Sequence, residues 1–477
     1  MIQYRAFALR KLASIAPRYL PFADVATEDV PLSRLLRLSL FQVTVGMAVV
    51  LLAGTLNRVM IVELSVPASL VAVMLALPLL FAPLRMVIGY RSDVHVSALG
   101  LRRVPYIWKG TLYQFGGFAI MPFALLVLSG YGESFDAPRW WGLSSAALAF
   151  LLVGAGVHMV QTVGLALATD LVREEDQPKV VGLMYVMLLV GMVLSALVFG
   201  ALLQTYSPGR LIQVIQGAAV LTVALNLFAM WKQEARDRVR AQRVQGTVPA
   251  PFRTVWPQMA PLRPLLIIIA LGTLGFGAAD VLLEPYGGQV LGFSVAETTR
   301  LTALLAGGTL IGFGIASKVL GRGGAPLRLA LIGALTGVPG FGAIILSSLG
   351  GGALMFLAGT LLTGLGAGLF GHATLTATIR AAPRDRIGLA LGTWGAVQAS
   401  FAGLGVALAG ILRDAILALP NGLETTAHAP YRAVFLVEIV FLVLACAMLL
   451  SQARQTSQQH TSPRPAAGPP PHPAEAS

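Results

Sequence analysis

Long apolar runs constrain this chain more than any other feature of its sequence. A window of about twenty residues, the length that crosses a bilayer as a helix, finds about twelve of them. Hydrophobic residues make up 56% of the chain and charged residues 12%, with a mean hydropathy of +0.77. A soluble domain could not bury so much apolar surface, so we expect an all-α integral membrane protein. The runs cover residues 36–60, 67–89, 105–129, 143–168, 180–203, 210–231, 265–287, 299–319, 326–348, 353–378, 387–411 and 431–451.

The order of these runs predicts five parts in the chain. They are a cytoplasmic N-terminal interfacial segment (1–35), a six-helix bundle (36–231), a charged cytoplasmic connector (232–264), a second six-helix bundle (265–451) and a polar, Pro-rich, disordered cytoplasmic tail (452–477). Two six-helix bundles around a central cavity are typical of the major facilitator fold.

The net charge of +13 favours a membrane orientation over nucleic-acid binding. Lys and Arg concentrate in the N-terminus, the connector and alternate loops, as the positive-inside rule predicts for cytoplasmic segments. We therefore expect a multi-pass inner-membrane protein with both termini in the cytoplasm. The N-terminus lacks the continuous apolar core of a signal peptide, and the single cysteine, Cys446, allows no internal disulfide.

A turn and a basic cluster separate the second run from the third, as in facilitator-type transporters. Gly89 permits a tight turn, and Asp93 can accept hydrogen bonds from helix-end amides. Arg102 and Arg103 can anchor to lipid phosphates. The glycine-rich segments GAGV from Gly154 and GAGL from Gly366 echo each other between the two halves and predict close helix packing.

Among the charged residues inside or near the ends of apolar runs, where a charge is costly, four are candidates for the cavity. Arg58 is expected to pair internally with Glu63 or a neighbouring carbonyl, whereas Arg85 is expected to snorkel to an interface. Asp280 and Glu284 lie one turn apart on one helix face. They could carry a proton, bond a substrate, or approach the outer interface.

Two histidines within apolar runs are candidates for pigment binding. His158 has Gln161 one turn further on, and His372 follows a glycine-rich segment. A neutral imidazole can ligate the magnesium of a chlorin, and neighbouring glycines leave room for a flat macrocycle. The alternative is a histidine that bonds across helices inside the bundle. His158 is the stronger candidate as an axial metal ligand.

Motifs for enzyme chemistry are scarce in this sequence. Phosphate-binding loops, metalloprotease helices and nucleophile elbows do not occur. Asp170 belongs to an acidic cluster with Glu174, Glu175 and Asp176, and a membrane prenyltransferase would use such carboxylates to hold magnesium diphosphate. Those enzymes usually present two facing clusters, so we interpret this one as an interhelical loop and retain Asp170 as a coupling candidate.

Six segments together resemble the PucC/LhaA family, a branch of the major facilitator superfamily. They are LNRVMIVEL (56–64), LPLLFAP (77–83), IGYRSDVH (88–95), RRVPYIW (102–108), HMVQTVGLALATD (158–170) and LEPYGG (283–288). The resemblance extends from about residue 36 to the last apolar run.

The resemblance implies an assembly factor for bacterial light-harvesting antenna in the intracytoplasmic photosynthetic membrane. It implies bacteriochlorophyll as the molecule handled, with a carotenoid also allowed. Antenna polypeptides are the implied partners, and the reaction centre, bacteriochlorophyll synthase and membrane-insertion machinery are further candidates. The Pro-rich tail favours the LH1 (LhaA-like) type over LH2. An older family label, a bacteriochlorophyll synthase subunit, has no catalytic motif behind it here.

Two other classes of function remain open from the sequence. A secondary transporter could move a tetrapyrrole or another small solute by alternating access, with coupling through Asp280 or Glu284. A pigment-esterifying enzyme is a more distant third class. Loss of uptake in carboxylate variants would indicate the transporter, whereas loss of antenna complexes would indicate the assembly factor.

Overall fold

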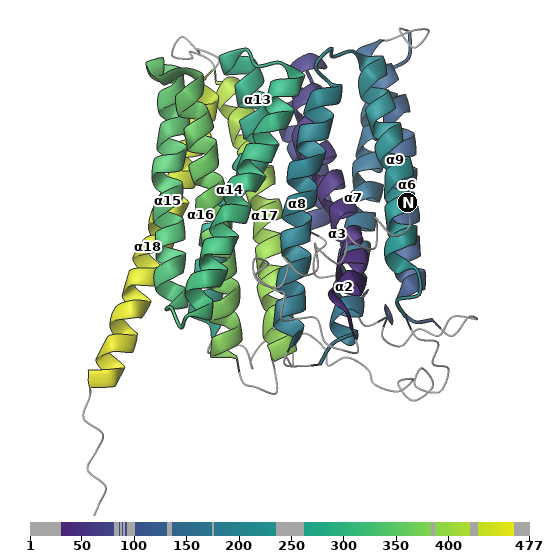
Figure 1. Cartoon of the computed structure of the whole chain (residues 1–477). Coiled ribbons are helices and arrows are strands. Elements are labelled where there is room, and N and C mark those ends of the chain that lie inside the picture. Colours follow the sequence, from purple (N-terminus) through teal and green to yellow (C-terminus); the bar gives the residue numbers. More distant parts are fainter. Residues whose placement is uncertain are drawn as a thin grey trace, which may run out of the picture.

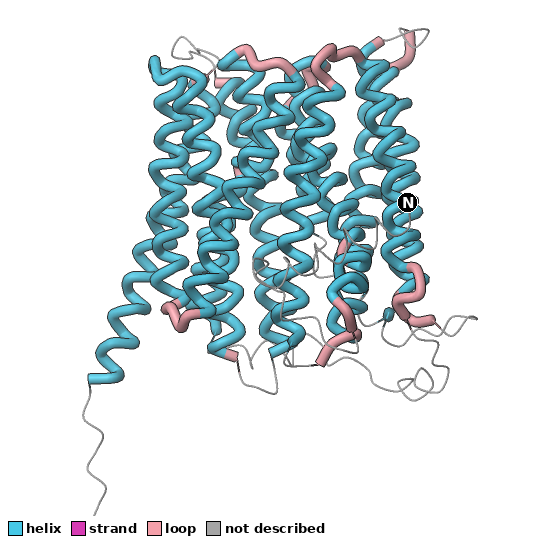
Figure 2. Tube along the Cα trace, viewed as in Figure 1, coloured by secondary structure: helices cyan, strands magenta, loops and turns pink. Residues whose placement is uncertain are grey.

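The computed structural model describes residues 30–80, 85, 88, 91, 92, 101–130, 136–173, 176–234, 262–382, 387–419 and 428–461. All regular secondary structure in these residues is helical (Figure 2). The predicted all-α class is therefore confirmed for the described part of the chain.

The helices between residues 32 and 230 form what we call the first half. In the described residues it begins with two short α-helices and two π-helices and continues with five further α-helices. Its helices are α2 (Leu32–Leu38), α3 (Leu40–Val49), the π-helices η2 (Val50–Leu56) and η3 (Val59–Glu63), α4 (Ala68–Leu80), α6 (Val104–Ser129), α7 (Arg139–Asp170), α8 (Gln177–Leu202) and α9 (Pro208–Met230).

Helices between residues 263 and 461 form the second half. They are α12 (Arg263–Gly277), α13 (Ala279–Leu291), α14 (Val295–Gly321), α15 (Pro326–Leu346), η7 (Ser347–Gly351), α16 (Gly352–Ala381), α17 (Ile387–Leu417) and α18 (Ala429–Thr461). The two halves stand beside each other with their helices roughly parallel to one axis (Figure 1).

Local sequence explains where many helices begin and end. Proline, which needs no helical N–H partner, occupies one of the first two positions of α6, α8, α9, α12 and α15. Ser294 and Glu297 form a capping box at the start of α14. Gly130 and Gly292 end α6 and α13 in the left-handed conformation that glycine adopts without strain.

Ten segments of the described chain are long and apolar enough to cross a membrane. One of them, Pro326–Ala381, contains α15 and α16, which lie side by side in Figure 1. The chain reverses between them at Gly350 and Gly352, whose φ angles are +112° and +64°. The apolar helix Ala68–Leu79 falls short of the length required within the described residues. The structure therefore gives ten segments where the sequence predicts twelve runs, because α15 and α16 count as one segment and Ala68–Leu79 is not counted.

Each half has its own hydrophobic core, and the halves meet along two helix pairs. The core of the first half includes Phe41, Phe118 and Phe150, and that of the second includes Phe341 and Phe435. The most extensive cross-half pairs are α4 with α17 and α8 with α14, and η2 and η3 also contact α13 and α14. Gly410 of α17 makes one contact possible, because a Cβ there would lie 2.4 Å from the Cβ of Ala72.

Both predicted outer boundaries of the helical region shift in the structure. The first helix begins at Leu32 rather than at residue 36, and α18 continues to Thr461 rather than ending at residue 451. Gln, Ala and Arg in residues 452–455 favour a helix, and the first proline comes only at Pro463. Residues 1–29, 235–261 and 462–477, which hold most of the predicted N-terminal segment, connector and tail, lie outside the described residues.

Candidate functional site

Hydrogen bonds between the halves gather at one end of the bundle, which we call the far end. The opposite end, where α9 ends and α12 begins, is the connector end. Asn57 Nδ2 donates to the carbonyl of Val281 at 2.7 Å, and the hydroxyls of Thr55 and Thr299 lie 3.2 Å apart. The Ser69 amide at the start of α4 donates to Asp414 Oδ2 near the end of α17 at 2.7 Å. Among the described residues, these polar contacts hold the halves together at the far end.

The first membrane segment reaches this end in π-helical form. π-helices are rare and usually short, and they occur often at functional sites. Here η2 and η3 flank Asn57 and Arg58, so the wider turns present both side chains to the second half. The structure confirms the predicted internal pairing of Arg58, which is buried, binds Glu63 and donates to the carbonyl of Phe293 at 3.0 Å.

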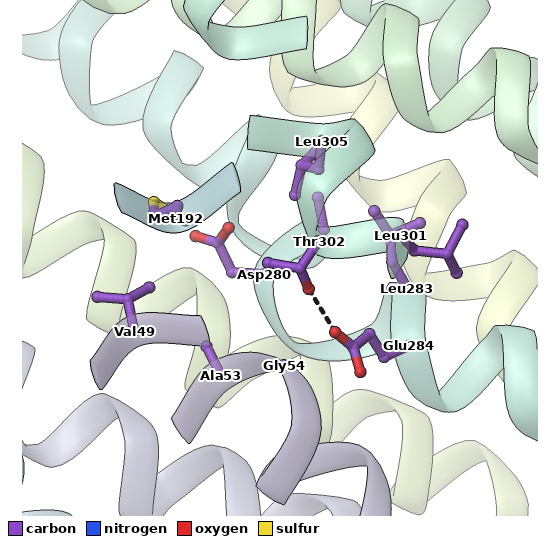
Figure 3. A pocket seen from close by; sticks show the side chains of 11 residues that line it. Val49, Ala53, Gly54, Met192, Asp280, Leu283, Glu284, Leu301, Thr302 and Leu305 are labelled. Atoms are coloured by element: carbon purple, nitrogen blue, oxygen red, sulfur yellow. Dashed lines mark hydrogen bonds between the residues drawn. The ribbon is translucent and has the colours of Figure 1, made fainter. Parts of the chain in front are cut away.

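A small cavity lies between the halves (Figure 3). The second half contributes Asp280, Glu284 and Thr302, and the first half contributes Val49, Ala53, Gly54 and Met192. Its volume is about 30 Å³, which is room for water rather than for a tetrapyrrole.

Glu284 is the buried polar group of this cavity. Its Oε1 accepts a hydrogen bond from the Thr302 hydroxyl, while its Oε2 has no hydrogen-bond partner among the described residues. Asp280, one turn earlier, has an exposed side chain on the same cavity. The structure thus places both members of the pair on this cavity between the halves. The two carboxylates face the contact between the halves, where they can hold water or exchange a proton.

Gly54 fixes how closely the halves approach here. A Cβ at this position would lie 2.6 Å from Glu284 Oε1 and 2.9 Å from Thr302 Oγ1. The absence of a side chain thus lets the hydrogen-bonded Glu284 and Thr302 pack directly against the π-helical turn of the first half.

Arg85 does not snorkel, so that prediction is corrected. Its Nε donates to Thr162 Oγ1 at 2.9 Å and its Nη2 donates to Gln161 Oε1 at 2.7 Å, both on α7. Arg85 is also a charged neighbour of His158 and Tyr185. The hydroxyl and amide of α7 satisfy the guanidinium within the bundle, so it does not have to reach water at an interface.

His158 is half-buried on α7, and its Nδ1 has no hydrogen-bond partner among the described residues. The glycines near it do not provide room for a macrocycle. A Cβ at Gly156 would lie 2.5 Å from the carbonyl oxygen of Gly110, and one at Gly154 would lie 2.4 Å from Pro78. These glycines permit close packing of α7 on α6 and α4, which confirms their predicted packing role.

His372 on α16 is packed differently. Its ring lies 4.1 Å from that of Phe313 between centroids, and its Nδ1 also lacks a hydrogen-bond partner among the described residues. A Cβ at the adjacent Gly371 would meet nothing within 4 Å. Open space therefore lies beside Gly371, the residue before His372, which is the histidine that sequence patterns favoured less.

At the connector end, a charge cluster ties the loop before α6 to two distant helices. Arg103 is buried and its Nε and Nη2 donate to Asp170 at the end of α7, at 2.5 and 3.2 Å. Arg102 donates to the same carboxylate at 3.3 Å. Glu234 accepts the backbone amides of Arg102, Arg103 and Val104 at 2.9 to 3.1 Å, which caps α6.

This cluster corrects two predictions, one for Arg103 and one for Asp170. Arg103 binds a carboxylate inside the protein rather than lipid phosphate, because Asp170 faces it across the loop. Asp170 lies at the connector end and does not line the cavity of Asp280 and Glu284. The helix-end amides of α6 are bonded by Glu234. Gly89 and Asp93 lie outside the described residues.

Sequence reasoning missed Glu438, the one acidic residue within the apolar run of α18. It is buried and its Oε1 accepts the backbone amide of Ala278 at 3.2 Å, at the break between α12 and α13. An ionisable residue alone in an apolar span is itself a signal of function, and it could have been read from the sequence. Thr302 and Gly54 carried no such signal.

Comparison with known proteins places the chain in a well-defined group. A family model described as "PUCC protein" matches residues 55–456. The chain is 68% identical over 450 residues to "Protein PucC" of Rhodobacter capsulatus, covering 93% of this chain and 97% of the relative. It is 61% identical over 428 residues to "Protein PucC" of Rhodovulum sulfidophilum, covering 89% and 94%.

Among solved structures, the fold is similar to that of transporters. A bacterial homologue of the human lysosomal transporter Spinster, in an inward-facing and unoccupied conformation, matches with a TM-score of 0.64 and 18% identity, over 91% of this chain and 98% of that one. The D-xylose-proton symporter also gives a TM-score of 0.64, with 15% identity, over 87% and 96%. At these identities the similarity shows the fold alone, which is that of major facilitator transporters.

Proposed function

The chain belongs to the PucC family, and from this premise we propose that it is an assembly factor for light-harvesting antenna complexes in a bacterial photosynthetic membrane. The family match over residues 55–456 is the observation that carries this proposal. The membrane-crossing helices and the facilitator fold support a role inside the bilayer, where antenna polypeptides receive their pigment.

The proposed topology has twelve crossings in two six-helix bundles. It counts α15 and α16 as separate crossings and counts α4 as the first part of a longer one. We further propose that the N-terminal segment, the connector and the tail lie on the cytoplasmic side of the inner membrane, as their Lys and Arg content favours.

Bacteriochlorophyll is the proposed cargo. The magnesium of a chlorin requires one axial donor, and an imidazole nitrogen free of hydrogen bonds suits it. His158 and His372 each offer an Nδ1 without a partner among the described residues, so the donor chemistry fits. The glycines near His158 are closely packed and leave no room there for a macrocycle, whereas a side chain at Gly371, next to His372 in sequence, would meet nothing within 4 Å. A carotenoid is a second apolar ligand within the proposal.

Antenna polypeptides are the proposed partners, together with the reaction centre, bacteriochlorophyll synthase and insertion machinery. We propose LH1 over LH2 as the antenna type. That choice rests on the Pro-rich tail, most of which lies outside the described residues. Deletion of residues 462–477 would test it, because LH1 absorption should then fall while LH2 absorption stays unchanged.

Purification in mild detergent tests the pigment part of the proposal. The protein should carry bacteriochlorophyll in its absorption spectrum and co-purify with antenna polypeptides. His158→Ala and His372→Ala together should lower the bound pigment severalfold, and each single variant shows how the two sites share it. His428→Ala, which changes a half-buried histidine just before α18, is the matched control. Unchanged pigment in the double variant would remove both histidines as ligands.

A secondary transporter is the second candidate, and one observation favours it. Asp280 and Glu284 face a water-sized cavity between the halves, the position from which a carboxyl group can exchange protons with either side during alternating access. Glu284→Gln should then abolish uptake or efflux of a small solute by vesicles that contain the protein. Under the assembly proposal the same variant should change antenna yield without any change in solute flux.

We propose that the protein performs no catalytic step on the pigment. The family label of a bacteriochlorophyll synthase subunit would instead require turnover by the isolated protein. Incubation with an isoprenoid diphosphate and a chlorophyllide, followed by chromatography of the pigments, tests this directly. An esterified product would overturn the proposal.

A further inference from the structure

An apolar groove on the second half contains a buried carboxyl group that has a free oxygen. The groove lies where α12, α17 and α18 meet, and its volume is about 300 Å³. It opens beside exposed apolar side chains, including Leu408 and Ile411 of α17 and Val437 of α18. In a membrane protein such a surface meets lipid, so the groove is accessible from within the bilayer.

Glu438 is the polar member of the groove lining. It is 3% exposed, and one of its oxygens caps the amide of Ala278 where α12 gives way to α13. Its Oε2 has no hydrogen-bond partner among the described residues. Backbone amides at the helix break, those of Ala278 and Gly277, bond this carboxyl group. Its Oε2 is a buried acceptor in the groove wall that still requires a partner.

The shape of the groove suits one extended chain. Its lining on α17 runs from Gly405 to Ala415, about 15 Å at the helical rise. Dividing the volume of about 300 Å³ by that length gives the groove a cross-section that fits a single hydrocarbon chain. A transmembrane helix, about 10 Å across, could place only side chains in it.

The position of Glu438 decides which polar group such a chain can carry. Glu438 lies about 13 Å along α18 from Ala429, close to the middle of a hydrocarbon layer about 30 Å thick. A phosphate or carboxylate head group would be both too deep in the membrane and repelled by the carboxyl group. A hydroxyl is neutral, and it can donate to a carboxylate or accept from a protonated carboxyl group.

We propose that this groove binds a long-chain alcohol, with the chain along α17 and the hydroxyl on Glu438 Oε2. The inference does not depend on the proposed assembly function, because it rests on the groove and its carboxyl group alone.

Photolabelling of the purified protein with a diazirine derivative of hexadecanol tests the proposal. Label should attach to peptides of α17 and α18 that line the groove. Unlabelled hexadecanol should compete, whereas hexadecanoate should compete at least about tenfold less well, because it lacks the hydroxyl donor and carries a negative charge. Leu408→Trp should fill the groove and remove most of the label.

Val440→Trp is the matched control, since Val440 of α18 is exposed to the same surface but does not line the groove. It should label as the unaltered protein does. If Leu408→Trp fails to fold, Ile411→Trp provides the same obstruction one turn away. Equal labelling of the groove variant and the control, or equal competition by hexadecanoate, would overturn the proposal. Protection only by an added antenna polypeptide would assign the groove to a protein helix instead.

Discussion

At the residue scale, Gly54 shows how a missing side chain positions a polar pair. We predict that Gly54→Ala lowers the thermal stability of the purified protein by several degrees. The added methyl group would lie against Glu284 and Thr302, and overpacking of this kind costs about 1–3 kcal/mol. Loss of monomeric protein on heating, followed by size-exclusion chromatography, measures it.

Gly217→Ala is the control for this prediction. It also lies in a membrane helix, but a Cβ there meets nothing within 4 Å. Alanine favours helix over glycine, so stability should stay equal or rise slightly. Equal thermal stability of the two variants would contradict the prediction. It would show that the side chains of Glu284 and Thr302 can move to accommodate a methyl group at residue 54.

The arginine and histidine sites show which side-chain contacts could be predicted from the sequence. The pairing of Arg58 could be predicted, because Glu63 lies close to it in sequence. The partners of Arg85 could not, since Gln161 and Thr162 come from a helix far along the chain. Glycines near His158 indicated close packing correctly, but the sequence could not tell whether a neighbouring helix or open space faces each one.

At the scale of the element, α6 depends on a cap from a distant part of the chain. We predict that Glu234→Ala destabilises the protein by about 1–2 kcal/mol, because Glu234 accepts the amides of Arg102, Arg103 and Val104. Removing this carboxylate also deprives the loop of its link to the end of the first half. Thermal unfolding monitored by circular dichroism provides the measurement.

Glu297→Ala is the matched control for the cap. Glu297 also bonds a helix start, but it is exposed and belongs to the capping box of its own helix. Its loss should cost less than that of Glu234. The reverse order would mean that the local box contributes more than the long-range cap.

The extents of most helices could be predicted from apolar runs, and their internal irregularities could not. The π-helical turns of η2 and η3 arise in a continuous apolar run without proline. The helix break at Ala278 is stabilised by Glu438, which accepts the Ala278 amide from another helix. Its position therefore depends on a tertiary contact that the local sequence does not show. The helical start of the tail was missed because polar composition was taken as disorder.

At the scale of the whole molecule, the far-end contacts decide which side of the protein is closed. We predict that Asp414→Ala raises the rate at which a water-soluble reagent reaches the cavity from the far end about tenfold. The substitution removes a charge-assisted hydrogen bond to the Ser69 amide, which joins the two halves. A cysteine placed at Thr302, next to the cavity, should then react faster with a membrane-impermeant maleimide.

Asp176→Ala tests whether any lost ion pair has this effect. Asp176 pairs with Lys179 within the first half, away from the cross-half contacts, so labelling should not change. An equal rate for Asp414→Ala and the unaltered protein would show that the remaining cross-half bonds suffice for closure.

The general architecture was open to prediction because twenty-residue apolar runs follow directly from bilayer thickness. The relation between the halves was not, because it depends on single contacts such as Thr55 with Thr299 and on the fit of Gly410 against Ala72. Contacts between single residues of different helices produce no repeating pattern in the sequence from which they could be predicted.

The last helix has a mechanical consequence. With 33 residues, α18 is about 50 Å long, well beyond the thickness of the hydrocarbon layer, and it projects below its neighbours at the connector end (Figure 1). The helix lines the groove near its start and projects into water at its other end. A protein that binds the projecting turns could therefore tilt the turns that line the groove without entering the lipid.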